Sequence, residues 1–312
     1  MRSLILNLLL LFLVISVPSS GQERVAYLMD ADRDKGDHTY SFEGIKKVDF
    51  ELDGGIILVE ALLNNSTQTF VLDSGAPGLI LNNYNKGKKK KKKKKKEQVT
   101  GINGTAQAYS VIIENFVWAG ISYPKMEAIS MDLSHLESIT KRKISGLIGY
   151  DLIKDFEVFL DYEASAIQIK SVGNSSTENL QPLVSFPLFF ENHLPVIEAK
   201  IGEENLRFGL DTGAEINLLN VQLSSRIAKM ASDPQVYGKI YGIGKKKEPA
   251  QIIKVSVTKL QRAAYREMNY VLTDFSSILS DGTNIDGILG FPFLSSCKFS
   301  IDFKTQQLKV WP

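Results

Sequence analysis

The sequence contains one unit twice. Residues 56–76, IILVEALLNNSTQTFVLDSGA, align without a gap on residues 194–214, LPVIEAKIGEENLRFGLDTGA. Further along, residues 146–169 align in the same order on residues 287–310. A correspondence of this length is a repeat and not an accident of composition, so both halves should fold into the same kind of unit. Each unit has about 130 to 140 residues, the size of a small domain.

Each unit is expected to consist mainly of β-strands. Residues 56–63 and 194–201 are short, largely apolar runs bounded by turn residues. Residues 156–160 and 299–303 show partial or clear alternation of apolar and polar side chains, which is typical of strands. The sequence therefore predicts an all-β fold with two related, β-barrel-like lobes and few short helices. The helical candidates are residues 133–141 and 224–231.

The repeat also predicts the domain boundaries. We expect a signal peptide over residues 1–21 and an N-terminal tail or short pro-segment over residues 22–41. The N-terminal lobe, with the first of two paired aspartates, is expected over residues 42–172. A Ser- and Asn-rich linker follows over residues 173–183. The C-terminal lobe, with the second aspartate, takes residues 184–312.

The first residues have the pattern of a secretory signal peptide. Arg2 precedes an apolar run from Leu4 to Val17, and the small residues of Pro18–Gly21 follow as a cleavage zone. The alternative, a membrane anchor, requires a longer apolar span. We therefore expect a secreted or periplasmic protein without stable membrane insertion.

The net charge of +2 is dominated by one segment. Lys88–Lys96 is an unbroken run of nine lysines, and without it the chain has fewer basic residues than its 35 Asp and Glu. A nucleic-acid site would have to rest on this run alone, without interleaved aromatic residues. We therefore expect no nucleic-acid partner.

The repeat places one aspartate after an apolar run in each unit. Asp73 lies in FVLDSGA and Asp211 in FGLDTGA. A lone D-S-G or D-T-G is more often a turn, but a duplicated unit with a twofold axis brings equivalent points together. Two carboxyl groups in close contact cannot both ionise at low cost, so they share a proton. One can then activate water while the other protonates a carbonyl oxygen.

These motifs resemble the aspartic proteases, of both the retropepsin-like and the pepsin-like types. The resemblance covers about residues 48–311 and includes the elements Leu147-Ile148-Gly149 and Ile288-Leu289-Gly290. It implies a bilobal aspartic-protease fold in which Asp73 and Asp211 are catalytic. The residues that it implies as support for the two active-site loops are Ser74, Gly75, Thr212 and Gly213.

The resemblance leaves the flap over the active site less well defined. The chain lacks the cysteines of animal pepsins and any clear tyrosine-bearing flap signature. The best candidate flap is the stretch Gly101, Ile102, Asn103 and Gly104, since a lid requires glycine hinges. The same stretch is equally well explained as a plain β-turn.

The function that the resemblance implies is an aspartic endopeptidase acting on peptide or protein substrates. It needs no metal or other cofactor, and a monomer would contain both halves of the active site. The resemblance, together with the apolar residues Leu79, Ile80, Leu218 and Leu219 near the loops, implies extended peptides with apolar side chains near the scissile bond. The alternative is a catalytically inactive module of the same fold that binds peptides or proteins.

Other chemistry has less support in the sequence. His38, His135 and His193 have no metal-ligand spacing and are expected to be ordinary surface or turn residues. Cys297, the only cysteine, has no signature of a nucleophile.

Overall fold

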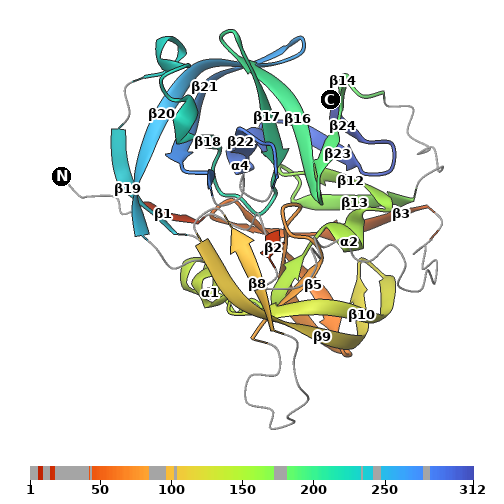
Figure 1. The fold of residues 1–312 in the computed structure, drawn as a ribbon. Helices are drawn as coiled ribbons and strands as arrows, with labels where there is room; N and C mark the ends of the chain where they lie inside the picture. Colours follow the sequence, from red (N-terminus) through yellow and green to blue (C-terminus); the bar gives the residue numbers. More distant parts are fainter. Residues whose placement is uncertain are drawn as a thin grey trace.

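The computed structural model describes residues 6–9, 15–17, 42, 44–83, 96–101, 104–171, 181–232, 235–241, 247–276 and 282–312. Its strands form three sheets, one for each repeated unit and one that joins them (Figure 1). Most of the nine-lysine run and residues 102 and 103 of the candidate flap lie outside the described residues.

The first unit, in the lower half of Figure 1, is built on a nine-stranded sheet. The strands are β2 (Ile15–Val17), β4 (Glu51–Asp53), β5 (Ile56–Leu63), β6 (Ser66–Leu72), β7 (Leu79–Asn82), β8 (Lys96–Gly101), β9 (Gly104–Trp118), β10 (Ile121–Met131) and β11 (Gly146–Ile148). Their order in the sheet is β2-β8-β9-β10-β7-β11-β6-β5-β4. Because β9 also pairs with β5, the sheet closes partly on itself as a barrel does.

The second unit, in the upper half of Figure 1, repeats this sheet strand by strand. The strands are β1 (Leu6–Leu9), β15 (Phe189–Glu191), β16 (Leu194–Ile201), β17 (Glu204–Leu210), β18 (Leu218–Asn220), β19 (Gln235–Tyr241), β20 (Lys247–Leu260), β21 (Ala263–Thr273) and β22 (Gly287–Leu289). Their order is β1-β19-β20-β21-β18-β22-β17-β16-β15, and β20 also pairs with β16. The two-lobed all-β prediction is confirmed.

A six-stranded sheet joins the lobes. Its strands are β3 (Ile45–Asp49), β12 (Phe156–Asp161), β13 (Ala166–Ser171), β14 (Val184–Pro187), β23 (Lys298–Asp302) and β24 (Gln307–Trp311). The order is β14-β24-β23-β12-β13-β3, so each lobe contributes equivalent strands. The two lobes meet where β12 and β23 pair antiparallel. The pseudo-twofold axis of the repeat therefore passes between these two central strands.

The described helices are short. They are α1 (Ser134–Thr140), α2 (Tyr150–Ile153), α4 (Phe291–Leu294) and the 3-10 turns η1 (Val221–Leu223) and η2 (Ala228–Met230). The helix predicted over residues 133–141 corresponds to α1. In place of the α-helix predicted over residues 224–231, the chain forms turns and the short 3-10 helix η2.

The burial pattern explains why the apolar runs continue without alternation. The first four residues of both β5 and β16 are buried, and alternation begins only after them. A strand that is covered on both faces requires apolar residues at consecutive positions. One small core cluster in each lobe covers the second face; the first contains Ala76 and Leu147, and the second contains Ala214 and Ile288. These clusters lie directly behind the two aspartate loops.

Candidate active site

Each aspartate follows the last residue of a buried strand. Asp73 comes after β6 and Asp211 after β17. The N–H of Asp73 donates to the carbonyl of Ile148 at 3.0 Å, and the N–H of Asp211 donates to that of Leu289 at 3.1 Å. Since β11 and β22 run parallel to β6 and β17, the same register holds both aspartates at the ends of their strands.

The two loops are joined by four hydrogen bonds across the pseudo-twofold axis. The N–H of Ser74 donates to Oγ1 of Thr212 at 3.0 Å, and that hydroxyl donates to the carbonyl of Leu72 at 2.9 Å. In the reciprocal direction, the N–H of Thr212 donates to Oγ of Ser74 at 3.0 Å, and that hydroxyl donates to the carbonyl of Leu210 at 2.9 Å. Each hydroxyl thus acts as acceptor and donor, which the hydroxyl group allows. These bonds fix the position of one loop relative to the other.

The two carboxyl groups lie together within this frame. Asp73 and Asp211 are buried, with 0% and 1% of their surface exposed. A Cβ atom added to Gly213 would lie 2.7 Å from Cγ of Asp73, so the loop of Asp211 can approach the other carboxyl only with glycine at this position. The N–H groups of Gly75 and Gly213 donate to Oδ1 of Asp73 and of Asp211, at 2.9 Å and 2.8 Å.

Burial raises the pKa of both carboxyl groups. For Asp211, burial is the main cause, and the charge of Asp73 raises the pKa further, against the lowering effect of the Gly213 N–H. For Asp73, burial raises the pKa, while hydrogen bonds from Asp211, Gly75 and Ala76 lower it. Each carboxyl group therefore changes the pKa of the other, and two buried carboxyl groups this close cannot both ionise at low cost.

A glycine in each apolar-apolar-Gly element supports the neighbouring loop from behind. A Cβ on Gly149 would lie 2.4 Å from the carbonyl oxygen of Ala76, and one on Gly290 would lie 2.5 Å from that of Ala214. The next residues, Tyr150 and Phe291, donate their N–H groups to these same carbonyls at 2.8 Å. The absence of a side chain therefore allows direct contact between each element and its loop.

The candidate flap lies at the end of a hairpin of β8 and β9, in which Gly101 is paired with Gly104. An equivalent hairpin of β19 and β20 exists in the second lobe. The sequence predicted a flap only in the first lobe, although IYGIG at residues 240–244 aligns on the candidate flap. This alignment could have been used to predict the second hairpin.

The apolar residues named as neighbours of the cleft have another role. Leu79, Ile80, Leu218 and Leu219 lie in β7 and β18 and are buried in the core clusters. They support the loops and give no reason to expect a preference for apolar substrates.

His193 was expected to be an ordinary surface or turn residue, and it does lie in the turn between β15 and β16, but it also contacts the site. Its Nε2 atom lies 2.8 Å from the carbonyl oxygen of Gly75, in the active-site loop of the other lobe. No pattern in the sequence indicates this contact.

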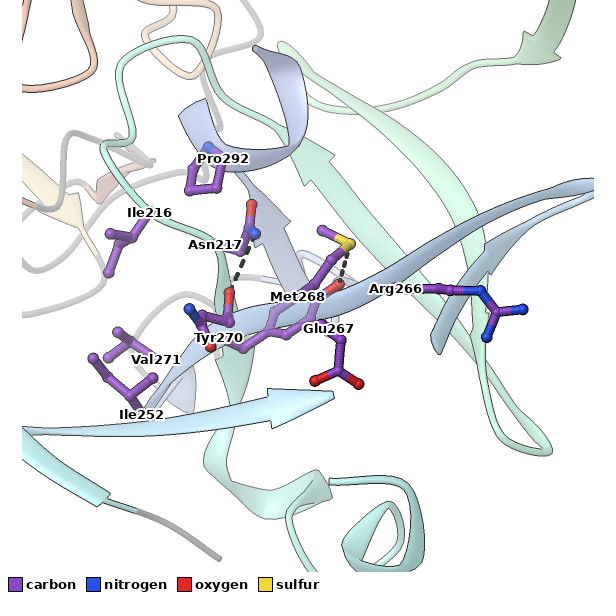
Figure 2. Close-up of a pocket in the computed structure, with 10 residues that line it drawn as sticks. Ile216, Asn217, Ile252, Arg266, Glu267, Met268, Tyr270, Val271 and Pro292 are labelled. Atoms are coloured by element: carbon purple, nitrogen blue, oxygen red, sulfur yellow. Dashed lines mark hydrogen bonds between the residues drawn. The ribbon is translucent and has the colours of Figure 1, made fainter. Parts of the chain in front are cut away.

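A cavity of about 350 Å³ borders the second active-site loop (Figure 2). Ile216 and Asn217 from the loop line it together with β20, β21 and Pro292. The Asn217 side chain donates to the carbonyl of Asn269 at 3.2 Å and accepts the N–H of Gly290 at 3.0 Å. Neither Asp73 nor Asp211 lines the cavity, so it lies beside the loop and not over the carboxyl pair.

Within the described part of the chain, no three His, Cys, Asp or Glu side chains are grouped as metal ligands. None of the described helices is long and apolar enough to cross a membrane.

The comparison with known protein families matches the two halves of the chain separately, as the internal repeat does. The sequence model of a family described as aspartyl protease matches residues 59–152 and residues 197–293. The two matches cover more than half of the chain, one in each lobe, and each includes one aspartate loop. A search of curated proteins found no significant match.

Proposed function

The chain belongs to the aspartyl protease family, and from this premise we propose that it is an endopeptidase in which Asp73 and Asp211 activate one water molecule. The observation that carries the proposal is the pair of adjacent carboxyl groups, which are buried, held by equivalent loops and raised in pKa by their burial. Such a pair supplies a base and an acid at one point, as peptide hydrolysis requires.

The reaction follows from the charge state of the pair. The ionised carboxyl removes a proton from water as its oxygen attacks the carbonyl carbon of the peptide bond. The protonated carboxyl gives its proton to the carbonyl oxygen, and a tetrahedral diol forms. A carboxyl then protonates the amide nitrogen, and the C–N bond breaks as one hydroxyl of the diol returns its proton to a carboxylate, so that the acid and amine products leave and the pair again holds one proton.

The arrangement of the lobes supports an extended peptide as substrate. Strands β8 and β19 are the outer strands of the two hairpins, and each accepts a further short strand, β2 or β1, at its edge. An edge that pairs with one extended segment can pair with another through the same backbone groups. We expect the substrate backbone to bind there, with the scissile bond over the dyad.

We also propose that the protein is processed and exported. The signal-peptide pattern over residues 1–21 supports secretion or a periplasmic location. A monomer would be sufficient for catalysis, because one chain contains both carboxyl groups.

The test is hydrolysis of a quenched-fluorescence peptide library between acidic and neutral pH. Asp73→Asn and Asp211→Asn should each lower kcat by a factor on the order of a thousand, because either change removes the shared-proton pair. The double variant should lose little more, because the two groups act as one device. Asp49→Asn, an exposed aspartate on β3, is the matched control and should keep full activity.

The alternative of a peptide-binding module predicts a different result. Wild type would then bind library peptides, neither single variant would change hydrolysis, and no peptide would be cut at any pH. Wild type that binds without cutting, or an Asp211→Asn variant that still cuts well, would rule out the proposed peptidase.

A further inference from the structure

A histidine from the second lobe contacts the active-site loop of the first. His193 lies in the tight turn between β15 and β16, after Asn192, which adopts a left-handed φ of 58°. This turn brings the partly buried imidazole to the loop, with Nε2 at 2.8 Å from the carbonyl oxygen of Gly75. Because a carbonyl oxygen can only accept, Nε2 bears the proton in this bond.

The carbonyl that His193 binds belongs to the residue whose N–H binds the dyad. Gly75 donates its N–H to Oδ1 of Asp73 at 2.9 Å, and the same N–H lowers the pKa of Asp211. Glycine has the least restricted backbone of any residue. A hydrogen bond on its carbonyl therefore limits the rotation of the peptide groups that direct the N–H toward the carboxyl groups.

The residue at the equivalent position of the first lobe cannot make this side-chain hydrogen bond. The repeat aligns His193 with Gly55, which has no side chain to donate. Gly55 instead packs against the ring of Phe291, where an added Cβ would lie 2.9 Å from Cγ. His193 thus binds the opposite loop through a polar side chain, whereas Gly55 lies against the Phe291 ring and its neighbour Gly54 lies beside the carboxylate of Glu215.

We propose that His193 is a positioning residue that holds the Asp73 loop through its hydrogen bond to the carbonyl of Gly75. The neutral imidazole is the relevant form, since burial lowers the pKa of His193, although the Gly75 bond and the charge of Asp151 partly oppose this. Asp151 lies on α2 and is itself paired with Lys154 at 2.9 Å. The role in catalysis rests on the proposed peptidase function, whereas the hydrogen bond does not.

The hydrogen bond can be tested in the wild-type protein without any activity. The ¹⁵N chemical shifts of the His193 ring distinguish its tautomers, and we expect a neutral ring with the proton on Nε2. A ring protonated only on Nδ1 would overturn the proposal, because it could not donate to Gly75.

Two substitutions separate the donor from the ring. His193→Phe keeps an aromatic ring without the donor, and His193→Gln keeps an N–H donor without the ring. In His193→Phe we expect the Gly75 amide hydrogen to exchange about fivefold faster, since a hydrogen bond of about 1 kcal/mol is lost. The Gly213 amide should exchange as before, and His193→Gln should largely restore the protection of Gly75. Asn192→Gly, an exposed change in the same turn that suits the positive φ, is the matched control.

Kinetics then test the positioning role. His193→Phe should lower kcat about ten- to a hundredfold through misplacement of Asp73, with KM nearly unchanged, and His193→Gln should recover most of the loss. Equal kcat in wild type and His193→Phe, or equal losses in both variants, would overturn the proposal. If wild type cleaves no peptide, the peptidase proposal fails, and the tautomer and exchange results still decide whether His193 holds the loop.

Discussion

At the scale of single residues, the site depends on groups that are satisfied only by their counterparts in the other lobe. Thr212 Oγ1 accepts the N–H of Ser74 and donates to the carbonyl of Leu72. Both partners belong to the first lobe, and both Ser74 and Thr212 are buried, with 1% and 2% exposed. The hydroxyls therefore stabilise the contact between the lobes as well as the position of the carboxyl groups.

Removing the hydroxyl group of Thr212 should consequently lower the free energy of unfolding by more than the loss of so small a group would do elsewhere. Thr212→Ala leaves the buried N–H of Ser74 and carbonyl of Leu72 without their partner, which should lower the free energy of unfolding by about 1–3 kcal/mol. Thr212→Ser keeps the hydroxyl and removes only a methyl group, so its loss should be clearly smaller. Urea unfolding of the two variants measures the difference. Equal losses would show that the methyl group, and not the hydrogen bonds, carries the effect.

The carboxyl pair should also make stability depend on pH. Burial raises the pKa of Asp73 from 3.8 to about 7, and it raises that of Asp211 as well. The folded chain then binds protons more tightly than the unfolded chain. Stability from this source is complete at low pH and is lost as pH rises toward the folded pKa, with a slope of at most about 1.4 kcal/mol per pH unit for each proton.

The double variant Asp73→Asn/Asp211→Asn lacks this titration. Relative to it, wild type should lose free energy of unfolding between about pH 4 and about pH 7, in the window that the pKa of Asp73 defines. Denaturant unfolding at a series of pH values measures both proteins. Parallel curves across this window would contradict the shared proton, whether or not the protein cleaves peptides.

At the scale of elements, a network of hydrogen bonds and ion pairs connects neighbouring strands of the six-stranded sheet, close to β12 and β23, where the two lobes meet. Lys309 on β24 lies 3.0 Å from Asp302 on β23 and 3.2 Å from Glu157 on β12. Ser300 donates to Glu157 at 2.6 Å and accepts the indole N–H of Trp311 at 2.9 Å. The network therefore connects strands of both lobes on one face of the sheet.

Lys309→Met removes the cation that pairs with both Asp302 and Glu157 and should leave two largely buried carboxylates side by side. We expect a loss of about 1–3 kcal/mol, less than for a fully buried pair because Lys309 remains 18% exposed. Lys298→Met is the control, since Lys298 is 39% exposed and lies 3.5 Å from Asp161 in the same sheet. It should lose less than about 1 kcal/mol.

The contribution of Lys309 should disappear in acid. Burial raises the pKa of Asp302, but hydrogen bonds from Thr305 and from Lys309 outweigh it, so the pKa lies below 3.8. A lowered carboxyl pKa gives stability above the unfolded value that is lost as pH falls through the folded one. The difference between wild type and Lys309→Met should thus narrow below about pH 4 and stay constant above it. A difference independent of pH would indicate lost packing of the lysine stem instead.

At the scale of the whole molecule, the repeat explains what the sequence could predict. Two copies of an apolar run that ends in D-S-G or D-T-G indicate equivalent strands, equivalent loops and a meeting point at their axis. The second hairpin, β19–β20, could have been found from the same alignment. The contact of His193 with Gly75 could not, because it depends on the direction of one turn between residues 118 positions apart. The prediction that Leu79 and Leu219 line the substrate cleft was wrong. A residue close to a loop in sequence can lie in the core behind the loop or on the side that faces the substrate, and sequence proximity does not distinguish the two.

The last prediction concerns the N-terminal region. The predicted signal peptide, residues 1–21, contains β1 and β2. Strand β1 pairs with β19 from Leu6↔Gly238 to Leu9↔Tyr241, and β2 pairs with β8 from Ile15↔Thr100 to Val17↔Gln98. Removal of residues 1–21 would therefore leave the edges of β8 and β19 available for a substrate strand.

We expect the mature protein to begin near Gln22 and to be found outside the cytoplasm. Peptide hydrolysis by residues 22–312 should be at least as fast as by the intact chain, because nothing from residues 1–21 then competes for these edges. N-terminal sequencing of the exported protein and rate measurements on both forms provide the test. Leu8→Arg/Leu10→Arg, which interrupts the apolar run, is the control and should keep Met1 and remain inside the cell. An exported protein with an intact Met1 would contradict the processing, and an intact chain that cleaves faster than residues 22–312 would contradict the competition.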